Sequence, residues 1–174
     1  MNKKVIIGII IGLITIILVG LALYFTFRKK DGNKEFKNDY FKVEYDASWK
    51  VKENKKYLEL EHKRTKAIVK IQYKILDENY IDTNLSSIRD NIVESIINQN
   101  EGYELINTSD NINKQYESYS YLYEKDDEQV LVNIYKKDST LVILYYDALS
   151  KYFDIVLDSA DTIIESLEIY SGEK

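Results

Sequence analysis

The sequence predicts an α+β domain in which helices flank a mainly antiparallel β-sheet, preceded by one transmembrane helix. Three observations support this prediction. An uncharged apolar run of 23 residues lies near the N-terminus. Much of the remaining chain consists of short segments in which apolar and polar residues alternate, as is typical of half-buried strands. Two further segments repeat their apolar residues at helical spacing instead.

The first part of the domain is predicted to contain strands only. Residues 40–45 alternate with period two, and residues 49–51 resume as a strand after a short turn. Residues 57–61 and 67–74 follow as the two arms of a hairpin joined by a polar stretch. Each arm places its aliphatic side chains on one face of the expected sheet.

A helix is predicted next, because four apolar residues recur three or four positions apart and Thr83 or Asn84 can cap its start. These apolar residues are Leu85, Ile88, Ile92 and Ile96. Four more strands are expected after it, and polar turns of hairpin length separate the last three. Their ranges are 103–108, 115–124, 129–136 and 140–146.

A second helix is predicted to begin near Ser150, with a short final strand at 168–170. Its apolar side is formed by Phe153, Leu157, Ala160, Ile164 and Leu167. The opposite side carries acidic residues at helical spacing, Asp154, Asp158 and Asp161. We interpret this acidic stripe as the solvated face of the helix, with a partner's basic patch as the alternative. Consecutive hairpins with helices between them predict an antiparallel sheet covered by helices.

The apolar run, residues 5–27, is long enough to cross a bilayer. At about 1.5 Å per residue it reaches roughly 34 Å, more than the hydrocarbon core of about 30 Å. Sixteen of its 23 residues are Ile, Leu, Val or Phe, and basic residues flank both ends. A cleaved signal peptide is the alternative, with residues 20–22 as a small-x-small cleavage triplet. The run continues past that triplet and is longer than a signal-peptide core, so we favour an uncleaved anchor.

The chain therefore divides into a short tail (1–4), the transmembrane helix (5–27), a basic and polar tether (28–38), the folded domain (39–170) and a second tail (171–174). Basic residues are more numerous after the span, which by the positive-inside rule would place the domain in the cytoplasm. A short N-terminal tail with two lysines is hard to translocate, however. We therefore expect a single-pass protein of the cell membrane with its domain outside the cytoplasm.

Gly8 and Gly12 form a G-x-x-x-G pattern within the apolar run. Small residues at this spacing can let two transmembrane helices pack closely, which would make the protein a homodimer. The alternative is that glycine is simply frequent in membrane helices. We keep both interpretations.

Composition excludes several classes of function. After residue 30 the chain has 29 acidic and 19 basic residues, so it would repel the phosphates of nucleic acids. Cysteine is absent, which rules out disulfides, thiolate metal sites and lipid attachment through cysteine. Proline is absent, arginine is scarce beside lysine, and Ile, Asn and Tyr are abundant. This composition indicates an AT-rich, bacterial genome.

Three segments carry a resemblance to a known family. Residues 40–51 combine an aromatic strand, a small turn and Trp49. The strand 140–146 is followed by a short loop and Phe153. Residues 160–167 form the end of a helix that runs into Ser166 and Leu167. This arrangement resembles the PsbP/Mog1-like superfamily over residues 39–170, although the proline usual in the opening turn is absent. The resemblance implies an α/β/α sandwich and an accessory or binding role, and it transfers no functional residues.

No catalytic residues, metal ligands or cofactor site are predicted. His62 is the only histidine, it lies at the edge of a predicted turn, and no nucleophile motif accompanies it. Asp126, Asp127 and Glu128 lack the spacing of a calcium loop and are interpreted as a solvated turn. A pair of carboxylates for glycan hydrolysis is set by the fold, so the sequence leaves it open.

Tyrosine provides the strongest binding signal. Fifteen of the 16 tyrosines follow the apolar run, and Tyr119, Tyr121 and Tyr123 share one face of a predicted strand. Such a face offers broad, rigid contact area for a protein or glycan partner. The alternative, which we weigh more heavily, is that these side chains fill the interface between sheet and helix.

Together these observations predict a non-enzymatic binding or accessory domain, held at the outer face of a bacterial membrane, that engages a protein or envelope component. Two alternatives remain at this level. One is a hydrolase that cleaves cell-wall glycan with two carboxylates. The other is a regulator tethered to the cytoplasmic face of the membrane.

Overall fold

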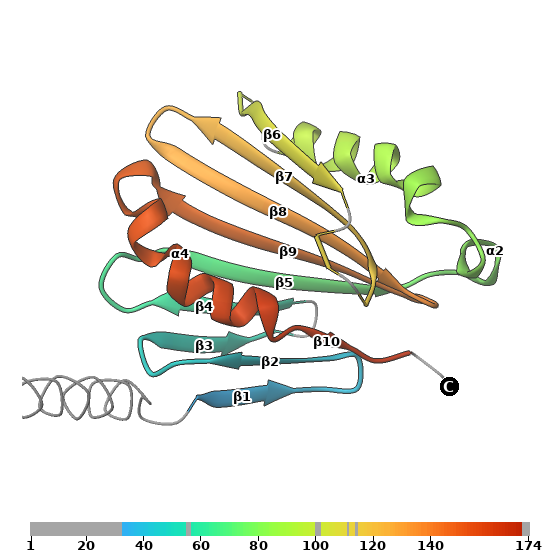
Figure 1. Cartoon of the computed structure of the whole chain (residues 1–174), viewed down its shortest axis with the longest axis horizontal. Helices are drawn as coiled ribbons and strands as arrows, with labels where there is room; N and C mark the ends of the chain where they lie inside the picture. Colours follow the sequence, from blue (N-terminus) through green and yellow to red (C-terminus); the bar gives the residue numbers. More distant parts are fainter. Residues whose placement is uncertain (1–32, 55–56, 100–101, 111, 114, 172–174) are drawn as a thin grey trace, which may run out of the picture. The chain divides into compact units, whose positions relative to one another are not determined.

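The computed structural model describes residues 33–171, apart from 55–56, 100–101, 111 and 114. This part of the chain contains ten strands and three helices, which Figure 1 labels. In order, they are β1 (Lys34–Lys37), β2 (Phe41–Tyr45), β3 (Trp49–Glu53), β4 (Tyr57–His62), β5 (Ile68–Ile75), α2 (Glu78–Ile81), α3 (Leu85–Gln99), β6 (Glu104–Asp110), β7 (Glu117–Lys125), β8 (Glu128–Lys137), β9 (Thr140–Leu149), α4 (Ser150–Glu165) and β10 (Glu168–Ile169).

Seven strands form one antiparallel sheet in the order β3-β4-β5-β9-β8-β7-β6. The hairpins β7–β8 and β8–β9 are joined by two-residue turns, in which Asp126 and Asp138 have positive φ angles of 53° and 49°. Aspartate tolerates this left-handed conformation better than most residues, so the polar turns predicted at these positions are confirmed. The strand β6 lies at one edge, and all seven of its side chains are exposed.

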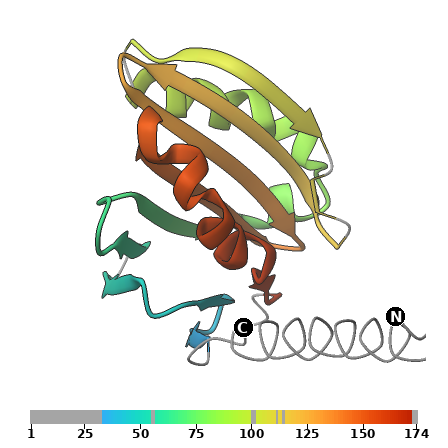
Figure 2. The same cartoon turned by 60° about the vertical axis from the view of Figure 1, so that its left-hand side comes forward.

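The period-two alternation divides this sheet into two differently covered faces. One face packs against α4, and the apolar sides of β4, β5 and β9 fill the space between them. The other face packs against α3, beneath which β7, β8 and β9 contribute a second apolar cluster. Figure 2 shows the two helices on opposite sides of the sheet. The predicted α+β architecture, an antiparallel sheet flanked by helices, is confirmed.

A second, three-stranded antiparallel sheet with the order β1-β2-β10 completes the core beneath α4. Its central strand contributes Phe41 and Val43, which are both fully buried. The C-terminal strand β10 pairs with β2 through Ile169 and Phe41, so the two ends of the domain are joined. The sequence indicated one sheet only, because nothing in a two-residue strand shows which partner it will take.

The N-terminal limit of the folded part differs from the predicted one. Residues 28–38 were expected to form a tether, yet Lys34–Lys37 form β1 and pair with β2 from Lys34 opposite Tyr45 to Lys37 opposite Lys42. Three of the four side chains of β1 are exposed. A strand of this kind carries no alternation signal, which explains why its sequence looks like a polar linker.

The predicted transmembrane helix, residues 5–27, lies outside the described residues, and so do Gly8 and Gly12. Among the helices that the structure describes, none is long and apolar enough to cross a membrane. The anchor and the helix-packing glycines therefore remain predictions from the sequence.

Candidate functional site

A polar cleft of about 730 Å³ opens between the C-terminal half of α4 and the sheet face formed by β7 and β8. The loop before β7 and the first residues after α4 close its ends. Charged and polar side chains line it more than apolar ones do. The polar and aromatic side chains that line it include Tyr116, Ser120, Asn133, Tyr135, Lys137, Asp161, Glu165 and Glu168.

The α4 wall of the cleft carries two carboxylates on successive helical turns, Asp161 and Glu165. Burial raises the pKa of Asp161 above its ordinary value, and the neighbouring charges of Glu165 and Asp158 raise it further. Neither cleft carboxylate forms a side-chain hydrogen bond or ion pair with another described residue. Asp161 is half-buried and Glu165 is exposed, so the helix presents to the cleft two carboxylates that have no partner among the described side chains.

The sheet wall of the cleft is formed by alternate residues of β8, which point toward α4. Asn133 and Tyr135 are almost fully buried there, with exposed fractions of 2% and 1%. Burial raises the pKa of the Tyr135 hydroxyl far above its ordinary value, and the neighbouring Asn133 side chain opposes this shift. The Oδ1 atom of Asn133 has no hydrogen-bond partner in the described part of the chain. A buried carbonyl oxygen of this kind is rare in native proteins.

At the far end of the cleft, residues of β10 form hydrogen bonds and an ion pair with other parts of the domain. The Lys137 ammonium donates a hydrogen bond to the carbonyl oxygen of Ile169 at 2.9 Å and lies 5.8 Å from the centre of the Tyr116 ring. The Ile169 backbone N–H donates to the Tyr116 hydroxyl at 3.1 Å. Glu168 forms an ion pair with Lys42 at 3.0 Å. At this end, cations and carboxylates are engaged with the protein itself.

A second hollow, a groove of about 460 Å³, lies on the opposite face between α3, α2 and the strands β5 and β9. Its floor is apolar, with Leu141 and Ile143, and α3 contributes Ile88 and Ile92. Polar side chains stand at several points of its lining. The cleft rather than the groove is the candidate site, because the cleft gathers two carboxylates and a buried amide oxygen that have no partner among the described residues.

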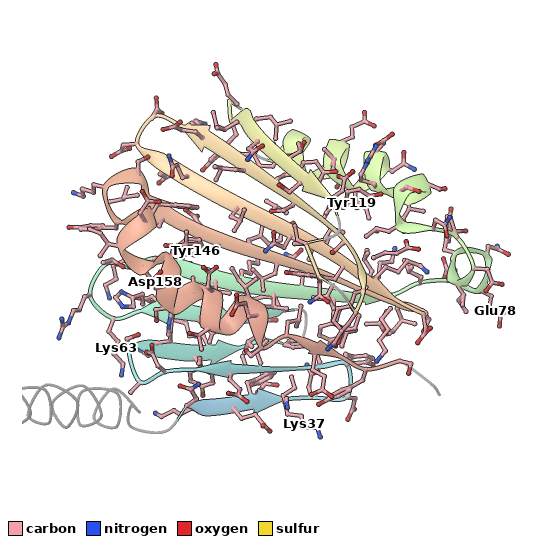
Figure 3. The ribbon with its side chains drawn as sticks, in the orientation of Figure 1. Lys37, Lys63, Glu78, Tyr119, Tyr146 and Asp158 are labelled. Carbon is pink, nitrogen blue, oxygen red and sulfur yellow. The ribbon has the colours of Figure 1, made fainter. Side chains whose placement is uncertain are left out.

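The predicted tyrosines lie on the groove's side of the sheet. Tyr121 and Tyr123 are buried between β7 and α3, with their ring centres 6.3 Å apart. Tyr119, which is labelled in Figure 3, is half-buried. The Arg89 guanidinium lies 4.9 Å from its ring centre. The helix α3 thus covers much of this face. A role for these three residues in binding a partner stays a prediction.

The remaining predicted residues lie away from the cleft. His62 Nδ1 is 2.8 Å from Thr65 Oγ1, and burial lowers the pKa of this histidine. Its ring also meets Trp49 edge-on, at 5.3 Å between centres. Glu128, at the β7–β8 turn, accepts a hydrogen bond from the Tyr103 hydroxyl at 2.9 Å. Among the described residues, no three His, Asp or Glu side chains are placed to hold a metal ion.

Sequence reasoning found part of one wall of the cleft but not the cleft. Asp161 was noted as a member of the acidic stripe, whereas Glu165 and Asn133 were not singled out. One signal existed for Asn133. It occupies an inward position of β8, between Leu131 and Tyr135, where alternation predicts an apolar residue.

Comparison with known proteins identifies the fold. No protein-family model matches the chain, and no curated protein matches it by sequence. Solved structures do match. The cyanobacterial PsbP protein (CyanoP) of Synechocystis sp. PCC 6803 has a TM-score of 0.63 and 13% identity, and the match covers 79% of this chain and 92% of CyanoP.

Two further structures give the same picture. LpqN of Mycobacterium tuberculosis, which is involved in cell envelope biogenesis, has a TM-score of 0.60 and 10% identity over 83% of this chain and 94% of LpqN. A Pseudomonas aeruginosa protein of unknown function, described as a putative regulator, has a TM-score of 0.54 and 13% identity over 80% and 98% of the two chains. The domain has a PsbP-like fold, and the expected resemblance is confirmed at the level of fold.

Proposed function

We propose that this protein is a membrane-anchored accessory domain on the outer face of a bacterial membrane, where its polar cleft binds a protein or another component of the envelope. The observation that carries the proposal is the cleft itself. It holds unpaired hydrogen-bond acceptors from α4 and β8 at its centre, whereas its other charged groups are already engaged with the protein. Such an arrangement suits recognition of a ligand group.

The location rests on the apolar run at residues 5–27, which is long enough to span a bilayer. One structural neighbour supports an envelope setting, since LpqN is described as involved in cell envelope biogenesis. Similarity at this level of identity concerns the fold. The envelope location of this chain is therefore our proposal, and the sequence supplies its main support.

The placement of the reactive groups supports the proposal of a non-enzymatic role. The two unpaired carboxylates, Asp161 and Glu165, extend from the same wall of the cleft because they lie one turn apart on α4. Glycosidases use two carboxyl groups that flank the scissile bond. Two groups on one wall are better suited to holding a ligand from one side. The only histidine of the chain, His62, lines neither the cleft nor the groove.

A glycan hydrolase is the second candidate, and one observation favours it. The raised pKa of Asp161 beside Glu165 is the kind of environment that gives one carboxyl the role of general acid. If the protein is a hydrolase, it releases reducing ends from purified cell-wall glycan, and Asp161→Asn and Glu165→Gln each abolish the release. Absence of release by the wild-type protein removes this candidate.

Site-specific crosslinking in cells tests the binding role. A photoreactive phenylalanine analogue replaces Gln115, an exposed residue that lines the cleft, or Ile155, a residue of α4 that is 73% exposed and lies outside the cleft. After irradiation of intact cells, we expect a defined adduct from position 115 and none from position 155. Equal adduct patterns from both positions, or no adduct from either, would count against the cleft as the binding site.

The anchor is tested with the same cells. Membranes are washed with alkaline carbonate, which removes peripheral proteins and leaves integral ones in the pellet. We expect the chain to stay in the pellet at its full length. Release into the wash, or a shortened chain whose N-terminus lies near residue 22, would indicate a cleaved signal peptide instead of an anchor.

A further inference from the structure

The unpaired groups of the cleft define the chemistry of a ligand more narrowly than the proposed function does. Asp161 and Glu165 contribute carboxylate oxygens, and Asn133 contributes a buried amide oxygen without a partner. All three are hydrogen-bond acceptors when the carboxylates are ionised. A ligand that satisfies them must therefore bring donors, and a cationic donor compensates the two negative charges as well.

The protein's own cations do not fill this role. Lys137 lines the cleft, but its ammonium is hydrogen-bonded to the carbonyl oxygen of Ile169 and lies near the Tyr116 ring. Lys42 is paired with Glu168. Within the described part of the chain, Lys137 is the only lysine or arginine that lines the cleft. The negative charge of Asp161 and Glu165 is thus left for a ligand.

The apolar lining of the cleft narrows the ligand further. Leu131 from β8, Ile164 from the end of α4 and Leu167 just after α4 lie among the polar groups. Aliphatic side chains of this kind cover a methylene chain well, as the stems of lysine side chains show when they lie along apolar surfaces. An ammonium group has three N–H donors and no acceptor. The number of these donors equals the number of unpaired acceptor groups in the cleft.

We propose that the cleft binds an alkylammonium group, with Asp161, Glu165 and the Oδ1 atom of Asn133 as its hydrogen-bond acceptors. This inference rests on the proposed function, because it names the ligand of the same cleft. The ammonium has two sources with the same chemistry, the side chain of a lysine in a polypeptide or a free diamine. Bound in this way, the cation replaces the ion pair that the cleft carboxylates lack.

Binding is expected to depend on pH in a defined direction. The charged and titratable groups around Asp161 are Asp158 and Glu165 on α4, Tyr135 on β8 and Tyr146 on β9. The carboxylates among them raise the pKa of free Asp161, whereas a bound cation lowers it. The ligand therefore binds the ionised form more tightly, and its affinity falls as the pH is lowered through the pKa of Asp161.

The test uses the full-length protein in detergent micelles and calorimetric titration at pH 7.5. The probe is Nα-acetyl-lysine methylamide, and its control is Nα-acetyl-norleucine methylamide, which has a similar aliphatic chain without the ammonium group. We expect the lysine probe to bind at least about tenfold more tightly than the norleucine probe. Asp161→Asn and Glu165→Gln should each weaken binding of the lysine probe by about tenfold. Asp154→Asn, which removes an exposed charge of α4 outside the cleft, should leave binding unchanged.

Two further measurements distinguish the two sources of the ammonium group and show whether each variant is folded. Cadaverine, a free diamine, is titrated in parallel. Tighter binding of cadaverine indicates a free diamine as the source, and tighter binding of the lysine probe indicates a polypeptide. Thermal unfolding of each variant is recorded, so that a loss of binding counts only in a folded protein. The conservative variant Asp161→Glu keeps the charge and should restore part of the binding that Asp161→Asn loses.

Equal binding of the lysine and norleucine probes, or unchanged binding in Asp161→Asn, would overturn the inference, as would binding of a neutral glycan oligomer without binding of either amine. The crosslinking experiment at position 115 keeps this failure separate from failure of the proposed function. A cleft-specific adduct in cells with no amine binding leaves the cleft as the binding site and removes only the ligand class.

Discussion

The indole Nε1 of Trp49 donates a hydrogen bond to Ser159 Oγ at 2.9 Å, and thereby joins the start of β3 to the middle of α4. Ser159 Oγ in turn donates to Asp46 Oδ2 at 2.8 Å, so one hydroxyl connects the indole, the helix and the β2–β3 turn. Trp49 is only 2% exposed. This network fixes α4 against the sheet, and α4 is the element that carries the cleft carboxylates.

Ser159→Ala tests the importance of that network. The substitution leaves the buried indole N–H without an acceptor and removes one donor from Asp46. We expect the free energy of unfolding to fall by about 1–3 kcal/mol, the cost of an unsatisfied buried polar group. The measurement is urea denaturation of the full chain in detergent. Thr162→Ala on the same helix serves as the control and should change the unfolding free energy by less than about 0.5 kcal/mol.

A stability change at or below that of the Thr162→Ala control would mean that the indole finds another partner. In that case the network would not be what positions α4.

Asp161→Asn should stabilise the domain at neutral pH. The folded-state pKa of this carboxyl is raised, so its ionised form is disfavoured by folding, and the penalty is present above the folded pKa and absent below the unfolded value of about 3.9. The amide keeps the shape without the charge. We expect a rise of a few degrees at most in Tm at pH 7.5, and a smaller rise near pH 4. Differential scanning calorimetry at both pH values measures the change in Tm.

Asp154→Asn provides the matched control, because it removes an exposed charge from the same helix. A lower Tm for Asp161→Asn at pH 7.5 would contradict the account, since it would show that the carboxylate has a stabilising partner. Such a partner would also leave less negative charge for a ligand.

Two buried tyrosines should respond oppositely to loss of the hydroxyl. Tyr146, labelled in Figure 3, donates a hydrogen bond to the Phe153 carbonyl oxygen at 2.7 Å. The Tyr123 hydroxyl, by contrast, has no partner among the described residues. Tyr146→Phe should lower the free energy of unfolding by about 1 kcal/mol. Tyr123→Phe should leave it unchanged or raise it, because a buried hydroxyl without a partner is costly. Urea denaturation compares them.

The Tyr123→Phe variant also tests the predicted binding role of the face formed by Tyr119, Tyr121 and Tyr123. If Tyr123→Phe is instead destabilising, its hydroxyl has a partner that the described structure lacks. If Tyr123→Phe is stable yet reduces a crosslink to a partner in cells, the tyrosine face takes part in binding, as the sequence suggested.

The sequence predicted the fold class well because the alternation of apolar and polar residues along a strand directly reflects which side chains are buried. The inward residues Leu58 and Leu60 of β4, for example, are fully buried as expected. The polar turns around Asp126 and Asp138 also lie where hairpins were predicted. These signals are local, and each can be read within a few residues of the chain.

The parts that were missed depend on contacts between distant segments. The strand β1 has exposed side chains and forms only by pairing with β2. The cleft joins Asn133 on β8 to Asp161 and Glu165 on α4, about 30 residues further along the chain. No local pattern shows that an inward asparagine will meet two helical carboxylates, because their meeting depends on how α4 crosses the sheet.

Topology is the measurement that tests the central claim most directly. The chain has no cysteine, so Ser171→Cys places a unique thiol at an exposed position just after the folded domain. Intact cells and lysed cells are treated with a membrane-impermeant maleimide. We expect labelling in intact cells, because the proposed orientation places the domain outside the cytoplasm. Labelling only after lysis would contradict it and would place the domain inside, as a regulator tethered to the membrane.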